Sequence, residues 1–254
     1  DCELLEQIYD CLREDEENGE NYGVRRIIAW LRLYRSYTGG ARRIYRICRE
    51  HHLTIHRQHR PNGLTKADRQ VEKSENLIQR DFTATKPSKK FLTDITEIPC
   101  SDGKLYLAAV LDCFDGSIQG FHMDDNMRAD LCVQALENAC RGINTEGLIL
   151  HSDRGSQFTC QLFRKALRRY KIVQSMSGTG RCYDNARMES FFATLKKEKL
   201  YHMDTTKLRR EDVKVIIFRY IHYYNLRRIS SVNDGLPPLM YRKNYWRSLP
   251  PTAA

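Results

Sequence analysis

Five short apolar segments between residues 91 and 177 constrain the fold of this chain more than any other feature of its sequence. The first three are separated only by the turn sequences SDGK (101–104) and DG (115–116), whereas a segment with helical periodicity precedes each of the last two. Strands joined by tight turns pair antiparallel, and strands joined through a helix can run parallel. The pattern therefore predicts an α/β domain in which helices cover a mixed five-stranded sheet.

The element order β-β-β-α-β-α-β-α is that of the ribonuclease H-like fold, in which the first and fourth strands lie side by side. We expect strands over residues 91–100, 105–114, 117–123, 147–153 and 171–177. We expect helices over residues 127–143, 159–169, 186–200 and 205–228.

Three acids occupy special places in this pattern. Asp94 lies in the middle of the first strand, where a buried charge is costly unless it is paired or binds a metal. Asp153 ends the fourth strand, and Glu189 follows the glycine-containing loop 178–185 on a helix. The strand order brings Asp94 close to Asp153, so the sequence favours a carboxylate site. For Asp153 the simpler alternative is a turn-forming role.

Other polar residues near these acids admit two interpretations. Asp112 is either a fourth site carboxylate or a structural hydrogen-bond acceptor. Asp184 and Asn185 are interpreted first as helix N-cap residues. His151 and Gln157 either contact a ligand or pack in the turn beside Asp153.

Charge is distributed unevenly around this segment. The chain carries a net charge of +10, and residues 22–60 hold ten arginines and one glutamate. Residues 22–35 and 41–52 have helical periodicity and flank the break SYTGG (36–40), which suits a helix-turn-helix module rather than a generic helical hairpin. Arginine binds phosphate well, so this module predicts nucleic-acid binding. The candidate DNA-binding residues are Arg25, Arg26, Arg42, Arg43 and Arg46.

The segments FLTDIT, HSDRGSQFT and GRCYDNARMESFFATLKKE resemble the catalytic signatures of bacterial insertion-sequence transposases with a retroviral-integrase-type core. The similarity is greatest to the group whose transposase is made by fusing two reading frames, and this chain resembles the downstream portion. YGVRRI and YIHYYNLRRISS resemble the flanking segments of that family, so the resemblance covers roughly residues 20–245.

The resemblance implies that Asp94, Asp153 and Glu189 form a metal-binding catalytic triad and that Lys196 contacts DNA. Oxygen ligands without a thiolate favour Mg²⁺, or Mn²⁺ as a substitute, and two ions suit phosphoryl transfer. The implied activity is metal-dependent 3′-end cleavage and strand transfer of insertion-sequence DNA. The alternatives are a catalytically idle DNA-binding regulator and a nuclease that cuts without joining.

The sequence also predicts a domain division and an environment. We expect a helix-turn-helix-like module over residues 1–60, a linker over 61–90 with a helix near 66–80, a catalytic core over 91–232 and a C-terminal tail over 233–254. The nine cysteines include no CxxC pair, which indicates a reducing cytoplasm, and no apolar run is long enough to span a membrane. The implied partners are the element ends and target DNA, bound by a homo-oligomer associated with the nucleoid.

Overall fold

The computed structural model describes residues 1–13, 22–53, 75–178 and 185–250 of the chain. It divides into two compact units. The sheet unit comprises Asn62–Ile221, and the helical unit comprises Asp1–Pro61 together with His222–Ala254. Each unit is described by itself, and the boundary between them falls within one long helix, α8 (Arg210–Leu226).

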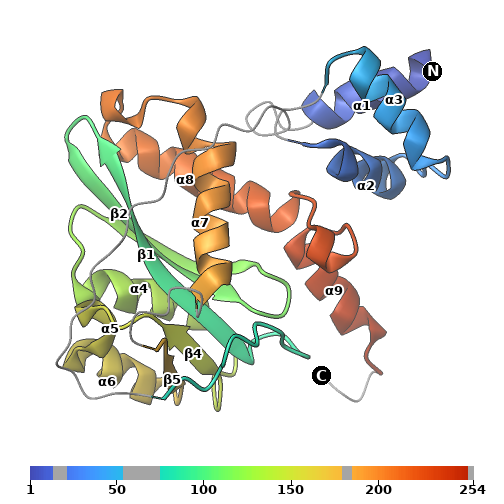
Figure 1. Ribbon diagram of the computed structural model, residues 1–254. Helices are drawn as coiled ribbons and strands as arrows, with labels where there is room; N and C mark the ends of the chain where they lie inside the picture. Colours follow the sequence, from blue (N-terminus) through green and yellow to red (C-terminus); the bar gives the residue numbers. More distant parts are fainter. Residues whose placement is uncertain (14–21, 54–74, 179–184, 251–254) are drawn as a thin grey trace. The chain divides into compact units, whose positions relative to one another are not determined.

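The sheet unit contains one five-stranded sheet with the order β3-β2-β1-β4-β5 (Figure 1). β1 pairs antiparallel with β2, and β2 pairs antiparallel with β3. β4 lies parallel to both β1 and β5. The predicted mixed sheet and its ribonuclease H-like order are therefore confirmed. The strands are β1 (Lys90–Cys100), β2 (Gly103–Asp112), β3 (Ile118–Asp124), β4 (Ile149–Ser152) and β5 (Val173–Met176).

Helices cover the sheet, and alternation along β1 decides which side chains each one meets. α4 contacts β2, β3 and α6, and α7 contacts β1. Phe91 and Leu150 belong to the apolar cluster that includes α4 and α6, so Leu92, Asp94 and His151 lie on the opposite face of the sheet. These helices are α4 (Ala129–Cys140), α5 (Ser156–Thr159), α6 (Gln161–Arg169) and α7 (Ala186–Glu198).

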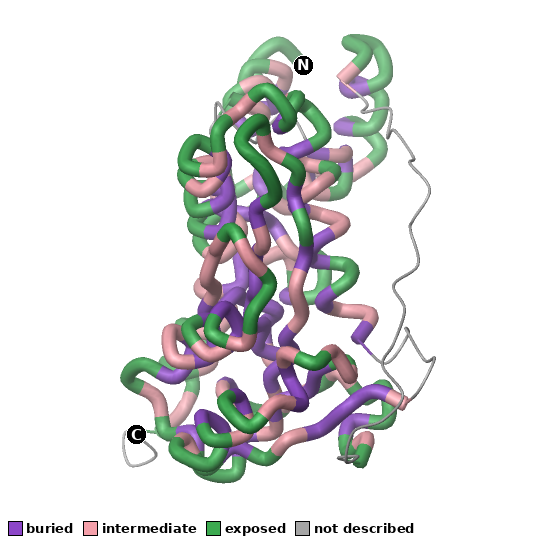
Figure 2. The backbone as a smooth tube through the Cα atoms, turned by 90° about the vertical axis from the view of Figure 1, so that its left-hand side faces the viewer, coloured by how far each residue is buried: buried purple, intermediate pink, exposed green. Residues whose placement is uncertain are grey.

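The helical unit begins with three helices, each of which has buried residues on one face. Figure 2 shows how buried and exposed residues alternate along the helices of the chain. α2 and α3 confirm the two helices expected around the SYTGG break, whereas the sequence analysis did not identify α1. Tyr22 is buried, donates a hydrogen bond to the Arg227 carbonyl and accepts one from the Ile229 N–H. The C-terminal segment is thereby joined to the first helices. The three helices are α1 (Cys2–Arg13), α2 (Val24–Tyr34) and α3 (Ala41–Glu50).

Two segments differ from the expectation. The region described as a tail contains an eleven-residue helix, α9 (Pro238–Ser248), which begins at the proline-rich sequence LPPL. Proline is favoured in a first helical turn because it has no N–H to donate and its φ angle is already helical. The helix expected near residues 66–80 lies mostly outside the described residues, and residues 75–80 are not helical.

The remaining regular elements are single turns. Short 3₁₀ turns cover Leu200–His202, Thr205–Lys207 and Ser231–Asn233. The first two separate α7 from α8, so α8 begins later than expected. None of the helices in the described ranges is long and apolar enough to cross a lipid bilayer.

Gly120 on β3 permits the close approach of α4, and this predicts a measurable loss of stability on substitution. A Cβ atom at this position would clash with backbone atoms of Ala135 and Ala139, which cannot rotate away. Gly120→Ala should lower the free energy of unfolding by about 1–3 kcal/mol, as overpacked interiors do. Urea denaturation followed by circular dichroism measures the change. Gly40→Ala is the control, since nothing lies within 4 Å of its added Cβ, and an equal loss in both variants would contradict the prediction.

Candidate active site

Asp94 and Asp153 lie at the same level of two neighbouring parallel strands. Leu92 of β1 pairs with His151 of β4. Each aspartate follows its member of this pair by two residues, so both side chains leave the sheet on the same face. Asp153 is the first residue after β4, where the strand ends and its side chain becomes exposed. The strand order thus brings together two acids that are 59 positions apart in the printed sequence.

Each aspartate uses only one oxygen in a local hydrogen bond. Asp94 Oδ1 accepts from the Ile95 N–H at 2.8 Å, and Asp153 Oδ1 accepts from the Gly155 N–H at 2.9 Å. The turn-forming role considered for Asp153 is therefore real, and it leaves the second oxygen available. Within the described part of the chain, Oδ2 of each aspartate and the carboxylate of Glu189 accept no hydrogen bond, so these oxygens can bind a further group.

Glu189 lies in the first turn of α7, and two side chains of that helix attach it to the sheet. The Asn185 amide donates to the Thr93 carbonyl at 3.2 Å, immediately before Asp94. The Arg187 guanidinium donates to the carbonyls of Phe82 and Cys113 at 2.7 and 2.6 Å. These bonds fix the start of α7 against β1. Figure 1 shows α7 (orange) lying across β1.

Asn185 occupies the expected N-cap position of α7, but its side chain makes no capping hydrogen bond. Its amide donates to Thr93 instead, and within the described residues its buried Oδ1 has no hydrogen-bond partner. Asp184 lies outside the described residues. The sequence analysis missed both anchors of α7, since the carbonyls that Arg187 binds are 105 and 74 residues away and no local pattern marks them.

The electrostatics of the site reflect crowded negative charge. Burial, and next the negative charge of Asp153, raise the pKa of Asp94 from 3.8 to about 7, and the charge of Glu189 adds to this rise. Burial also raises the pKa of Asp153 and of Glu189, although water reaches both side chains. The three predicted triad residues therefore interact electrostatically at Asp94.

Lys196 follows Glu189 by seven residues, so both lie on the same face of α7. The Lys196 side chain is partly buried. Burial lowers the pKa of its ammonium group, and the negative charges of Asp94 and Glu97 oppose this effect. The ammonium group thus lies near Asp94 and partly offsets the charge of the acids. Its predicted contact with DNA stays a prediction.

The donor set of this site fits a divalent cation of the Mg²⁺ type. All three side chains offer oxygen atoms, and their negative charge, which Lys196 offsets only in part, favours a cation. As they stand, the residues that the structure describes include no group of three or more His, Cys, Asp and Glu side chains arranged to hold a metal ion. An ion at this position would therefore require the acids to converge further.

The residues that flank the acids have structural roles here. His151 is fully buried, and its two ring nitrogens lie 2.8 Å from Ser175 Oγ and 3.1 Å from Ser177 Oγ. Gln157 donates to the Met127 carbonyl. Of the two interpretations of these residues, turn packing is the one that the structure shows.

Asp112 does not join the site. It pairs with Phe91, while Asp94 pairs with Ala109, because the β1–β2 hairpin turns nearer to residue 101 than to 103. Its buried carboxylate accepts hydrogen bonds from the N–H groups of Ser88 and Phe114. The structural interpretation of Asp112 is therefore correct.

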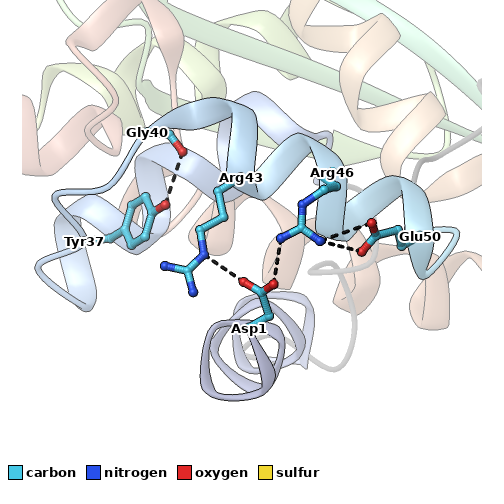
Figure 3. A network of polar contacts seen from close by, with 6 residues as sticks. All are labelled: Asp1, Tyr37, Gly40, Arg43, Arg46 and Glu50. Atoms are coloured by element: carbon cyan, nitrogen blue, oxygen red, sulfur yellow. Dashed lines mark hydrogen bonds and ion pairs between the residues drawn. The ribbon is translucent and has the colours of Figure 1, made fainter.

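The candidate DNA-binding arginines of the helical unit differ in the side chains that they contact. Asp1 accepts hydrogen bonds from Arg43 at 2.8 Å and from Arg46 at 2.6 Å, and Glu50 also binds Arg46 (Figure 3). The guanidinium of Arg26 lies over the ring of Tyr22. Arg25 and Arg42 are exposed and form no side-chain ion pair or hydrogen bond within the described residues.

Comparison with known proteins identifies one family consistently. Models of the integrase core domain match residues 84–182 and 189–245. A transposase-like protein of Haemophilus influenzae is 40% identical over 169 residues, which cover 66% of this chain and 77% of that protein. The transposase InsK for insertion element IS150 of Escherichia coli is 38% identical over 168 residues, and the chain matches 59% of its length.

Two solved structures share the fold. The HTLV-2 integrase catalytic core domain in complex with magnesium has a TM-score of 0.50 at 18% identity, and the match covers 62% of this chain and 98% of that one. An intasome of simian T-cell lymphotropic virus has a TM-score of 0.56 at 14% identity over 89% of this chain and 76% of that one. These identities are low, so the structures support the fold alone.

The raised pKa of Asp94 predicts how stability depends on pH when metal is absent. Below about pH 4 the carboxyl is protonated in the folded and the unfolded chain, so it contributes no difference. Between about pH 4 and 7 the folded chain holds this proton more tightly, so stability falls as the pH rises. Asp94→Asn removes the effect and should be more stable than the parent at pH 8 by roughly 1–4 kcal/mol.

Urea denaturation in buffer with EDTA, at pH 4 and at pH 8, measures this difference. The two proteins should have the same stability at pH 4. A variant that is no more stable than its parent at pH 8 would contradict the raised pKa of Asp94.

Proposed function

Because the chain belongs to the family of insertion-sequence transposases with an integrase core domain, we propose that it catalyses metal-dependent cleavage at the 3′ ends of insertion-sequence DNA and joins those ends to other DNA. The observation that carries this proposal is the placement of Asp94 and Asp153 at one level of two adjacent strands, with Glu189 close enough to influence the pKa of Asp94. The chain matches 59% of the length of the Escherichia coli relative, so the activity of a whole transposase is part of the proposal.

The three acids have distinct places in this proposal. Asp94 and Asp153 offer their free oxygens from the sheet, and Glu189 approaches from α7. Bound Mg²⁺ would supply charge stabilisation for the attacking and leaving oxygens of a phosphodiester. The relative that binds magnesium has the same fold, which supports this assignment.

The chain's own side chains would orient the DNA. Asn185 and Arg187 bind backbone carbonyls of the sheet unit and so hold the start of α7, which carries Glu189, against β1. Lys196 would bind a DNA phosphate beside the acids. The chemistry needs no covalent protein intermediate: water releases a 3′-OH, which then attacks a second phosphodiester.

Arginines of the helical unit would hold DNA outside the site. We assign this role first to the exposed Arg25 and Arg42, which bind no other side chain within the described ranges, and to the partly exposed Arg26. Arg43 and Arg46 would contribute after their bonds to Asp1 give way to phosphate. Relatives of this fold include an intasome, so an oligomer on DNA is part of the proposal.

Strand transfer tests the assignment of the triad. Asp94→Asn, Asp153→Asn and Glu189→Gln should each abolish cleavage and joining of labelled element ends in Mg²⁺, with DNA binding near that of the parent. Lys196→Ala should reduce transfer by weakening DNA engagement. Asp130→Asn, which neutralises an exposed acid at the start of α4, is the matched control and should leave transfer unchanged.

Each outcome distinguishes one alternative. Transfer that survives in one of the three variants would remove that residue from the triad. Cutting without joining in the parent chain would favour a nuclease. Binding with neither reaction would favour a DNA-binding regulator.

Salt dependence of DNA binding tests the role of Asp1. Asp1→Asn leaves Arg43 and Arg46 without this carboxylate, so DNA affinity at low salt should rise by up to about 5-fold, the value of an exposed ion pair. Arg42→Gln should lower the slope of log affinity against log salt by about 0.9, the loss of one phosphate contact. Fluorescence anisotropy with labelled duplex DNA measures both. An unchanged slope in Arg42→Gln would exclude a phosphate contact by that residue.

A further inference from the structure

α9 is a helix with little buried surface. Of its eleven residues only Pro238 is buried, and the others are partly or fully exposed. Helices of globular proteins usually bury an apolar stripe. Packing against a core therefore does not explain the side chains that α9 exposes.

Three exposed residues of this helix form a surface that we call the α9 face: Lys243, Trp246 and Arg247. All three are exposed, and their spacing of three and four residues places them on one side of the helix. Trp246 keeps 50% of its surface exposed. The other tryptophan, Trp30, is buried at 2% exposure in the helical unit.

The charges of the α9 face are uncompensated. Lys243 and Arg247 are like charges four residues apart, an arrangement that destabilises a helix. The segment from Pro238 to Pro250 contains no acid, and within the described residues neither cation has a side-chain ion pair or hydrogen bond. In α3, by contrast, Asp1 and Glu50 neutralise Arg43 and Arg46.

An exposed indole between two unpaired cations suits a nucleic acid. Cations contact the phosphates, and an aromatic ring stacks on a base that is not held in a duplex. A symmetric contact with a second copy of the chain would place Lys243 and Arg247 against the same cations, which disfavours self-association. The ring of the neighbouring Tyr245, which is less exposed, contacts the Trp246 ring edge to face at a centroid distance of 5.2 Å.

We propose that the α9 face is a DNA-binding surface, on which Trp246 stacks against an unpaired base while Lys243 and Arg247 bind the adjacent phosphates. This inference rests on the proposed function, because cleavage at an element end supplies such unpaired bases. It adds a contact site in the region that the sequence analysis described as a tail.

Tryptophan fluorescence of the full-length chain tests the proposal directly, since Trp246 is the exposed member of the two tryptophans. Single-stranded oligothymidylate should quench the emission of the parent protein and not that of Trp246→Phe. Trp246→Ala should weaken binding of this DNA by roughly 5- to 150-fold, the effect of losing one base stack. Trp246→Tyr should restore most of the affinity.

Substitutions of the two cations, and of a control residue on the same helix, complete the test. Lys243→Gln and Arg247→Gln should each lower the salt slope for single-stranded DNA by about 0.7. Asn244→Ala changes an exposed residue on a different side of α9 and should bind normally. Circular dichroism should show the same helix content in every variant.

All variants are made in the Asp153→Asn background, so a failure of the proposed chemistry does not affect the measurement. Quenching that persists without Trp246, or no quenching in the parent, would overturn the proposal. Emission that shifts with protein concentration in the absence of DNA would overturn it in favour of self-association. Equal binding of oligothymidylate by Trp246→Ala and its parent would overturn the stacking role.

Discussion

The placement of Asp94 and Asp153 side by side on one face of the sheet is the constraint that the rest of the sheet unit has to maintain. Two parallel strands place the acids at one level on one face, and burial raises the pKa of Asp94 to about 7. A protein gains no stability from such a pair unless a cation or a proton joins it. The rest of the sheet unit holds the acids together despite this penalty: α4 packs closely on β3 at Gly120, and the β1–β4 pairing fixes their separation.

α7 adds the third acid by a different physical means. Its inner residues Met188, Phe191 and Leu195 are buried, but apolar packing alone permits a helix to slide or rotate. Arg187 and Asn185 bind backbone carbonyls, which are directional partners. The two bonds of the Arg187 guanidinium are charge-assisted, so they fix a position as well as adding stability. Glu189 thus belongs to a helix whose first turn is held in place, while Lys196 brings positive charge toward Asp94 from a later turn.

The basic residues of the helical unit differ in whether an acid is paired with them among the described residues. Asp1 binds both Arg43 and Arg46, and Glu50 binds Arg46, so part of the positive charge is already satisfied (Figure 3). Among the described residues, no acid pairs with Arg25, Arg42, Lys243 or Arg247. A polyanion would gain most from the second group, because no existing ion pair has to break. Net charge alone, which counts all these residues equally, does not reveal this difference.

The sequence by itself determined the strand order, the helices α2 and α3, and the three acids worth testing, because periodicity and turn residues are local properties of the chain. It missed α1 and α9, and it assigned Asn185 a capping role. Only the tertiary structure decided that Asp112 pairs away from Asp94, that His151 is enclosed by two serines, and that Asp1 binds two arginines of α3. Each of these outcomes depends on a register or on a partner more than twenty residues away, and no local pattern encodes either.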